Sequence, residues 1–342
     1  MIIQACVAPV RSLPTASIGC LLASDPLPNM IDSLSPVAAL TNVNGAVRCD
    51  HLGVIRARGE DAAKFLHGQL TQDFALLDTT HARLTSFCTA KGRMLASFVG
   101  FKRADGEILL VCSRDVLPAA LKRLSMFVMR AKVQLSDASD ALPVWGLAGA
   151  AVSADLPPDP WSLHSSADDS AEVRLYPGHG VARALRVAPT GAPALDAGTM
   201  TDGLWQWLEV MSGVAGITQP IVEAFVPQML NHESVGGVNF KKGCYPGQEV
   251  VARSQFRGTL KRRAYLVASA QPLVVGQEVF HASDAEQPCG TVAAAAANPT
   301  GGWNAIVSMQ TNAAVGGALH AGSLSGPTLA LLPLPYALLD DI

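Results

Sequence analysis

The sequence carries little charge and no long apolar run. Charged residues make up 15% of its 342 residues, and 25 Lys and Arg against 28 Asp and Glu leave a net charge of −3. This balance argues against a globally basic nucleic-acid-binding protein. No apolar stretch approaches the roughly 18 residues that cross a bilayer. Because 49% of the residues are apolar, the chain is not a disordered one, and its length predicts two or three domains.

Common catalytic and metal-binding motifs are missing as well. No Gly precedes a Lys, which excludes a Walker A loop, and no G-x-S-x-G is present. His232-Glu233 lacks the second His of a zinc-protease helix. No two cysteines have C-x-x-C spacing, so we predict no intrinsic metal. Seven scattered thiols suit a reducing cytoplasm. They are Cys6, Cys20, Cys49, Cys88, Cys112, Cys244 and Cys289.

The first residues do not resemble a signal peptide, which needs a basic start followed by a continuous apolar segment. The only early cation is Arg11, and prolines interrupt the sequence around it. We expect residues 1–45 to be a loosely ordered N-terminal extension. The whole chain is expected to be cytoplasmic, with no membrane association.

Hydrophobic patterning predicts an α+β protein in which helices cover one face of a mostly antiparallel sheet. We expect Asp115 to cap a helix in which Pro118 is tolerated in the first turn. The first domain, 46–140, is expected to contain strands at 49–58, 82–88, 93–101, 107–112 and 132–135 and helices at 62–67 and 116–129.

Two further domains are expected. The second, 141–255, has a surface loop at 156–169, strands at 171–176 and 180–187, and a helix at 202–211 that carries Trp205 and Trp207. These two tryptophans face different sides of the helix, and core packing is the default for both. The third domain, 256–342, consists of short strands between Gly, Pro and Asn turns, which is typical of a small β-barrel.

Residues 242–253 read KGCYPGQEVVAR and carry the strongest local signal. Pro246-Gly247 suits a type II turn, so a strand at 238–240 would deliver Cys244 to the tip of a tight loop before a helix starting at Gln248. Backbone N–H groups at that helix start, together with Lys241 and Lys242, would favour anions and a thiolate. Two interpretations stay open: a reactive or ligand-contacting thiol, or a small thiol in a turn that serves only for shape.

The surrounding segment is strongly basic. Seven cations against the single anion Glu249 could meet a polyanionic ligand tail or an RNA backbone, or they could simply form a solvated face. The cations are Lys241, Lys242, Arg253, Arg257, Lys261, Arg262 and Arg263. A second, weaker block places GQLTQD, with Gln69 and Asp73, after a helix. The cationic hairpin turn Lys91-Gly92-Arg93 follows it in the sequence.

Taken together, KGCYPGQEVVAR, GQLTQD and KGRM resemble the YgfZ-type folate-binding proteins, which are relatives of the aminomethyltransferase (T-protein) of the glycine cleavage system. The resemblance covers roughly residues 50–336. It implies three domains in a ring around a channel for tetrahydrofolate. It also implies a role in assembling or repairing iron–sulfur clusters, including those of tRNA-modifying enzymes.

The resemblance assigns roles to individual residues. The signature Cys and Lys fall on Cys244 and Lys242, and one folate-linked aromatic residue matches Trp207 while the other position is Leu52. The T-protein's catalytic acid is missing from residues 92–97, and Val214 stands where relatives have an acid before Ala215-Gly216. The candidate folate-binding residues are Gln69, Asp73, Trp207, Tyr245, Gln248, Arg253 and Arg257.

Three functions are compared on this basis. The leading hypothesis is a folate-binding accessory factor in iron–sulfur protein maturation, with Cys244 and Lys242 at its centre and iron–sulfur enzymes as clients. The second is a folate-dependent one-carbon transferase, which would need an acid that residues 92–97 do not supply. The third is an RNA-binding module that uses the basic segment and predicts a steep salt dependence.

Overall fold

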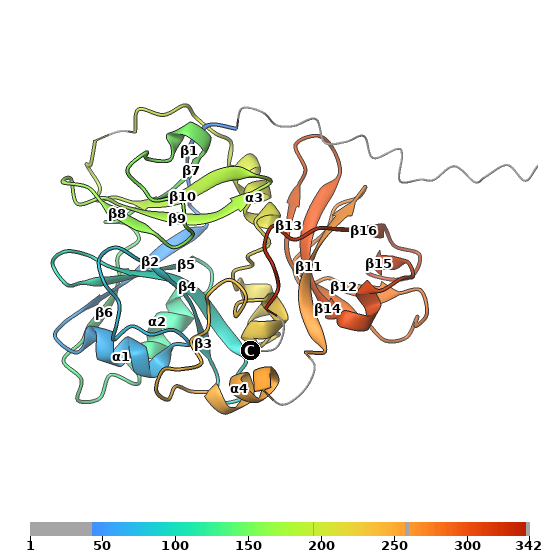
Figure 1. The fold of residues 1–342 in the computed structure, drawn as a ribbon, viewed down its shortest axis with the longest axis horizontal. Helices are drawn as coiled ribbons and strands as arrows, with labels where there is room; N and C mark the ends of the chain where they lie inside the picture. The colour runs from blue at the N-terminus through green and yellow to red at the C-terminus, as the bar shows by residue number, and fades with distance from the viewer. Residues whose placement is uncertain (1–42, 194, 257–259, 340–342) are drawn as a thin grey trace, which may run out of the picture. The chain divides into compact units, whose positions relative to one another are not determined.

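The computed structural model describes residues 43–193, 195–256 and 260–339. Candidate residue Arg257 therefore lies outside the described part. The predicted N-terminal extension, 1–45, also lies outside it, except for its last three residues. Within the described part, the strands form two five-stranded sheets and one closed six-stranded barrel near the C-terminus (Figure 1). This confirms the α+β class with a C-terminal barrel. The predicted domain boundaries stay predictions.

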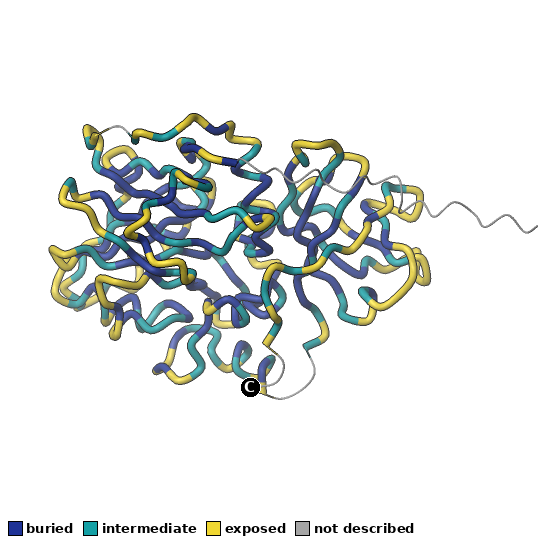
Figure 2. Tube along the Cα trace, turned by 45° about the horizontal axis from the view of Figure 1, so that its top comes forward, coloured by how far each residue is buried: buried dark blue, intermediate teal, exposed yellow. Residues whose placement is uncertain are grey.

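Helices of the described ranges are all too short or too polar to cross a membrane. Figure 2 shows that the strands carry most of the buried positions, whereas the exposed positions gather in the connecting loops.

The first sheet has the order β3-β4-β5-β2-β6, and every neighbouring pair in it is antiparallel. One face is the core that receives the two helices, because Phe65 of α1 and Leu124 of α2 pack in the same buried cluster as Ile55, Phe98 and Leu110. The elements are β2 (Leu52–Arg58), α1 (Ala62–Gln69), β3 (Arg83–Cys88), β4 (Met94–Lys102), β5 (Ile108–Ser113), α2 (Leu117–Ser125) and β6 (Gln134–Asp137). Side chains alternate between faces along a strand, so Ser97 and Val99 of β4 and Val111 of β5 point away from this core.

The second sheet has the order β1-β7-β10-β9-β8 and is covered by helix α3. Gly146 permits this packing, because a Cβ there would lie 2.5–2.7 Å from the ring of Trp205. The guanidinium of Arg183 lies 4.4 Å from the centroid of that ring. The elements are β1 (Gly45–Arg48), β7 (Val144–Ala148), β8 (Leu163–Ser165), β9 (Ala171–Gly178), β10 (Val181–Val187) and α3 (Asp202–Met211).

The barrel closes in the order β11-β14-β13-β12-β15-β16. One face of helix α3 packs on the second sheet, and its other face contacts the barrel. On that second face the indole N–H of Trp207 donates to Asn304 Oδ1 at 2.8 Å. Both tryptophans are thus fully buried, and they anchor α3 on two sides. The strands are β11 (Arg262–Ser269), β12 (Glu278–His281), β13 (Gly290–Ala297), β14 (Trp303–Gln310), β15 (Leu319–Ala321) and β16 (Thr328–Leu332).

Three local predictions are wrong. Residues 238–240 form no strand, because the Asn239 N–H donates to Thr71 O instead of entering a ladder. Asp115 does not cap α2, since its carboxylate accepts from Ser113 Oγ and the Gln219 N–H. The loop predicted at 156–169 contains the short edge strand β8, which pairs with β9.

Helix α2 also ends at Ser125, four residues before the predicted end at 129. Met126 and Met129, which would have continued it, are 72% and 86% exposed. A short helix is stabilised mainly by packing of its apolar face against the rest of the protein. The side chains of Met126 and Met129 have no such packing, so the helix does not continue through them.

A buried histidine joins the first sheet to the segment after α3. His232 is fully buried, with one ring nitrogen 3.1 Å from Ser86 Oγ and the other 3.0 Å from Ala215 O. Burial lowers the pKa of His232 to about 4, although the Ala215 carbonyl works in the other direction. The imidazole is therefore neutral in the folded protein at neutral pH.

This histidine should make the fold acid-sensitive. Its folded-state pKa is depressed, so the unfolded chain takes up the proton first and stability falls as the pH drops from about 6.5 towards 4. A shift of this size corresponds to about 3 kcal/mol of lost unfolding free energy. Urea unfolding at pH 7 and at pH 4.5 measures this difference in unfolding free energy. His232→Gln should flatten the dependence, and the half-buried His164→Gln should not; an equal slope in wild type and His232→Gln would contradict the assignment.

Candidate functional site

The cysteine loop is held in place by Lys242, whose ammonium group lies at the C-terminal end of α1. Lys242 Nζ donates to His67 O at 2.5 Å and to Leu70 O at 2.9 Å. Terminal carbonyls of a helix carry the negative end of its dipole and lack partners within the helix. Burial lowers the Lys242 pKa to about 8, with Asp73 and Cys244 acting against the shift. The signature lysine thus joins two sequence blocks that are about 170 residues apart.

Further hydrogen bonds connect the same two blocks. Thr71 Oγ1 donates to Gly237 O at 2.7 Å, and Gln72 Nε2 donates to Gly236 O at 2.7 Å. Together with the bond from Asn239 N–H to Thr71 O, they fix the chain that leads into the cysteine loop. The glycine pair and the GQLTQD block are therefore structural partners.

Asp73 forms its hydrogen bonds with residues close to it in the sequence. Its Oδ1 lies 3.0 Å from His67 Nδ1 and accepts from the Leu76 N–H at 3.0 Å. Burial raises the Asp73 pKa, but these hydrogen bonds outweigh it and hold the pKa below its ordinary value. Gln69, the last residue of α1, has a buried Oε1 with no hydrogen-bond partner among the described residues.

The turn after Cys244 forms as predicted. The Gln248 N–H donates to Tyr245 O, and Gly247 has φ of +84°, as position i+2 of a type II turn requires. A Cβ at Gly247 would lie 2.4 Å from Thr89 O and 2.7 Å from the Gly92 Cα. The loop therefore packs against the 89–92 hairpin turn, and α4 (Gln248–Phe256) starts at the predicted residue. All three sequence blocks meet here.

Cys244 is exposed, in contrast to the other four cysteines of the described part of the chain. Burial raises the thiol pKa in each of those four, to about 12 for Cys88. Tyr245 is buried next to Cys244, with the Lys242 ammonium 4.5 Å from its ring centroid. The loop thus offers one accessible thiol on a backbone that its neighbours hold firmly.

The basic segment is partly committed to the fold. Besides Lys242, Arg263 pairs with Glu233 and Arg262 donates to Cys289 O. Arg253 is exposed and pairs with Glu249 one turn earlier on α4. These pairings reduce the continuous free positive face that an RNA backbone would need.

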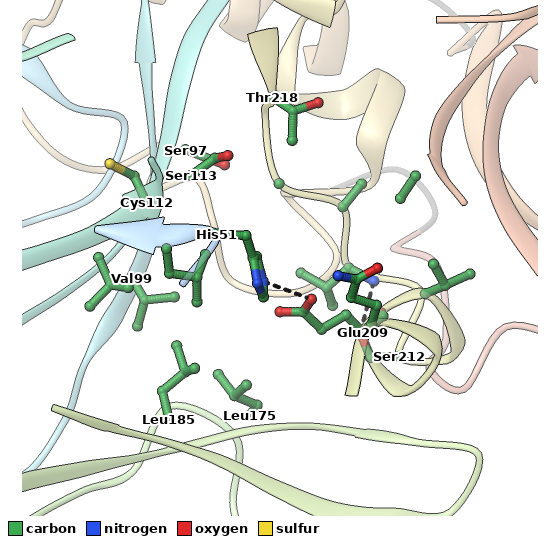
Figure 3. A pocket seen from close by; sticks show the side chains of 18 of the residues that line it. His51, Ser97, Val99, Cys112, Ser113, Leu175, Leu185, Glu209, Ser212 and Thr218 are labelled. Carbon is green, nitrogen blue, oxygen red and sulfur yellow. Dashed lines mark hydrogen bonds and ion pairs between the residues drawn. The ribbon is translucent and has the colours of Figure 1, made fainter. Parts of the chain in front are cut away.

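A separate cavity of about 540 Å³ opens between both sheets, α3 and the barrel (Figure 3). Of the predicted site residues within the described ranges, none lines it. Trp207 is fully buried and bonds to Asn304 of the barrel instead. The positions of Leu52 and of Val214, Ala215 and Gly216, which the sequence resemblance associates with folate, do line it. Other lining residues include His51, Ser97, Val99, Val111, Ser113, Asp115, Leu175, Arg183, Leu185, Gln206, Glu209, Thr218 and Ala294.

The cavity is mostly apolar and has a few polar groups. His51 Nε2 lies 3.2 Å from Glu209 Oε2; burial lowers the His51 pKa, but the nearby carboxylate outweighs this and raises it above its ordinary value. Arg183 is fully buried, and this lowers its pKa to about 10. Thr218 Oγ1 is buried without a partner in the described structure. The arrangement suits a flat, largely apolar ligand with a polar edge.

Sequence reasoning missed Glu209 and His51. The available signal was an acidic residue in the apolar helix LWQWLEVM, on the same side as Trp205 four residues earlier. No group of three or more His, Cys, Asp or Glu in the described ranges is placed to hold a metal ion.

Two sheets with their helices and a C-terminal barrel give the chain the fold of an aminomethyltransferase. The solved aminomethyltransferase T of the glycine cleavage system from Bartonella henselae superposes with a TM-score of 0.61 over 86% of each chain, at 16% identity. No family model matches the chain.

Curated relatives identify the family more closely. The tRNA-modifying protein YgfZ of Cronobacter sakazakii is 30% identical over 295 residues, covering 82% of this chain and 89% of its own length. That of Photorhabdus laumondii is 29% identical over 320 residues, covering 90% and 96%. The chain belongs to the YgfZ family, as the sequence motifs predicted.

Proposed function

We propose that this protein binds tetrahydrofolate and acts as an accessory factor in the assembly or repair of iron–sulfur clusters, with tRNA-modifying enzymes among its clients. The relatives' name, tRNA-modifying protein, supports the connection to tRNA modification. The folate part rests on the motif resemblance and on the physical character of the cavity, and the iron–sulfur part rests on the motif resemblance alone.

The cavity carries this proposal. Its volume of about 540 Å³ lies within the usual range for small-molecule sites, which combine apolar walls with a few placed polar groups. Val99, Val111, Leu175 and Leu185 would flank a flat ring. The unpartnered hydroxyl of Thr218 supports the presence of a polar ligand, because buried polar atoms are normally paired. When bound, a reduced folate supplies one-carbon carrier chemistry.

Cys244 lies outside this cavity, and that separation suggests two different tasks. The cavity would hold folate, while the exposed thiol would meet the client protein or its cluster. A thiol that must reach a partner has to be accessible, and Cys244 is accessible on a loop fixed by Lys242.

Ser97 argues against the alternative function, a folate-dependent transferase. This residue lines the cavity and its Oγ accepts from the Ile217 N–H at 2.9 Å, so a neutral hydroxyl stands within the stretch where the T-protein has its acid. General acid–base catalysis of aminomethyl transfer would lack its carboxylate there.

Anaerobic calorimetric titration of the purified protein with tetrahydrofolate tests the proposal, together with an aminomethyl-transfer assay containing the other glycine cleavage proteins. We expect saturable folate binding and no transfer. Robust transfer would replace the accessory role with the transferase. An absence of folate binding, combined with tRNA binding that weakens steeply with salt, would favour the RNA-binding module.

A further inference from the structure

Two carboxylates line the cavity, and they differ in what they are free to do. Both oxygens of Asp115 are used inside the chain, by Ser113 Oγ at 2.7 Å and the Gln219 N–H at 2.9 Å. The carboxylate of Glu209 forms one ion pair among the described residues, from Oε2 to His51 Nε2. Its Oε1 accepts no hydrogen bond from them, so Glu209 retains acceptor capacity at the cavity wall.

The position of Glu209 is rigid. Helix α3 is fixed against the second sheet by Trp205, whose ring fills the space above Gly146, and against the barrel by the bond from Trp207 to Asn304. A recognition group on an element held from two sides keeps its geometry better than one on a loop. Figure 3 shows the paired His51 and Glu209 between Leu175 and Leu185 on one side and Thr218 on the other.

The charges around Glu209 are arranged to support a carboxylate at this place. His51 contacts one oxygen directly, and the buried Arg183 interacts with Glu209 through space. His51 Nε2 makes no in-line hydrogen bond in spite of its 3.2 Å distance. His51 and Glu209 therefore lie close together without a well-aligned hydrogen bond between them. The carboxylate can still accept hydrogen bonds from a ligand.

We propose that Glu209 is the group that recognises the ligand in this cavity, by accepting from two adjacent N–H donors at the edge of a flat heterocycle. The inference rests on the proposed folate function, in which that edge is the 2-amino group and ring N–H of the pterin. Hydrogen bonds to a carboxylate are about twice as strong as neutral ones, and a paired donor edge also sets orientation. His51 is a positioning residue that holds the carboxylate towards the cavity.

Removing the charge should weaken binding in a way that depends on the 2-amino group. A hydrogen bond to a charged group contributes about 1.5–3 kcal/mol, so Glu209→Gln should weaken tetrahydrofolate binding roughly tenfold to a hundredfold. The 2-desamino-2-methyl analogue of tetrahydrofolate lacks one donor. We expect it to bind wild type more weakly and to lose less affinity in the variant than tetrahydrofolate does, because only its ring N–H still donates to the carboxylate.

The experiment measures both dissociation constants for wild type, Glu209→Gln and the control Glu286→Gln, which removes an exposed carboxylate from a barrel loop. Thermal melting confirms that each variant is folded. Equal tetrahydrofolate affinity in wild type and Glu209→Gln would overturn the proposal, and so would equal losses for both ligands, which would indicate a structural effect. Binding of neither ligand by wild type would reject the proposed folate function itself.

Discussion

Replacing Arg263 with Met is expected to destabilise the protein by about 3–5 kcal/mol, since it leaves an uncompensated buried charge. Arg263 lies on β11 and its Nη1 donates to Glu233 Oε1 at 2.6 Å, while its Nη2 donates to Leu339 O at 2.6 Å. The Glu233 side chain is fully buried and that of Arg263 is 10% exposed. Burial raises the pKa of Glu233 despite the guanidinium, so loss of the arginine leaves this carboxylate without its main stabilising partner.

Urea unfolding followed by fluorescence measures this effect. Arg262→Met is the matched control: Arg262 is the preceding residue on β11 and donates to a neutral carbonyl, that of Cys289. Its loss should cost about 1 kcal/mol, as for an ordinary hydrogen bond. The double variant Glu233→Gln/Arg263→Met should recover much of the lost stability. Similar costs for Arg262→Met and Arg263→Met would contradict the importance of the buried pair.

Much of the fold could be predicted because local patterns and tertiary packing agree. Helix α3 has the predicted bounds, and its two tryptophans alternate between the second sheet and the barrel. The strand at 238–240 failed for the opposite reason. Its β-branched and aromatic residues suit a strand, but the Asn239 N–H is taken by Thr71, which is remote in sequence.

The candidate site was predictable only in part. Motif letters identified Lys242, yet the cap that it forms on α1 needs the carbonyls of His67 and Leu70, whose position is a property of the folded chain. Glu209 and His51 carry no motif, because they come from different elements and meet only across the cavity. Local spacing contains no information about such a contact.

Replacing Cys244 with Ser should abolish the ability to restore iron–sulfur enzyme activity in a deletion strain while leaving the fold intact. The loop does not need sulfur for its shape, because the turn is formed by the Gln248 N–H and the left-handed Gly247, and its entry is fixed by Lys242. The side chain is exposed, and surface substitutions of this kind usually change stability by less than about 0.5 kcal/mol. Thermal melting and complementation, measured on the same variant, separate the two effects.

Timed alkylation read by peptide mass gives the independent measurement. Reaction requires access and thiolate character, so Cys244 should be alkylated before the buried Cys49, Cys88, Cys112 and Cys289. Cys289→Ala is the matched control, because it removes a thiol inside the barrel and should retain complementation wherever the protein is folded. If a folded Cys244→Ser variant restores full activity, or if a buried thiol reacts first, the thiol has no direct role and the loop is structural. If Cys244→Ser melts normally but fails to complement, the sulfur itself is required.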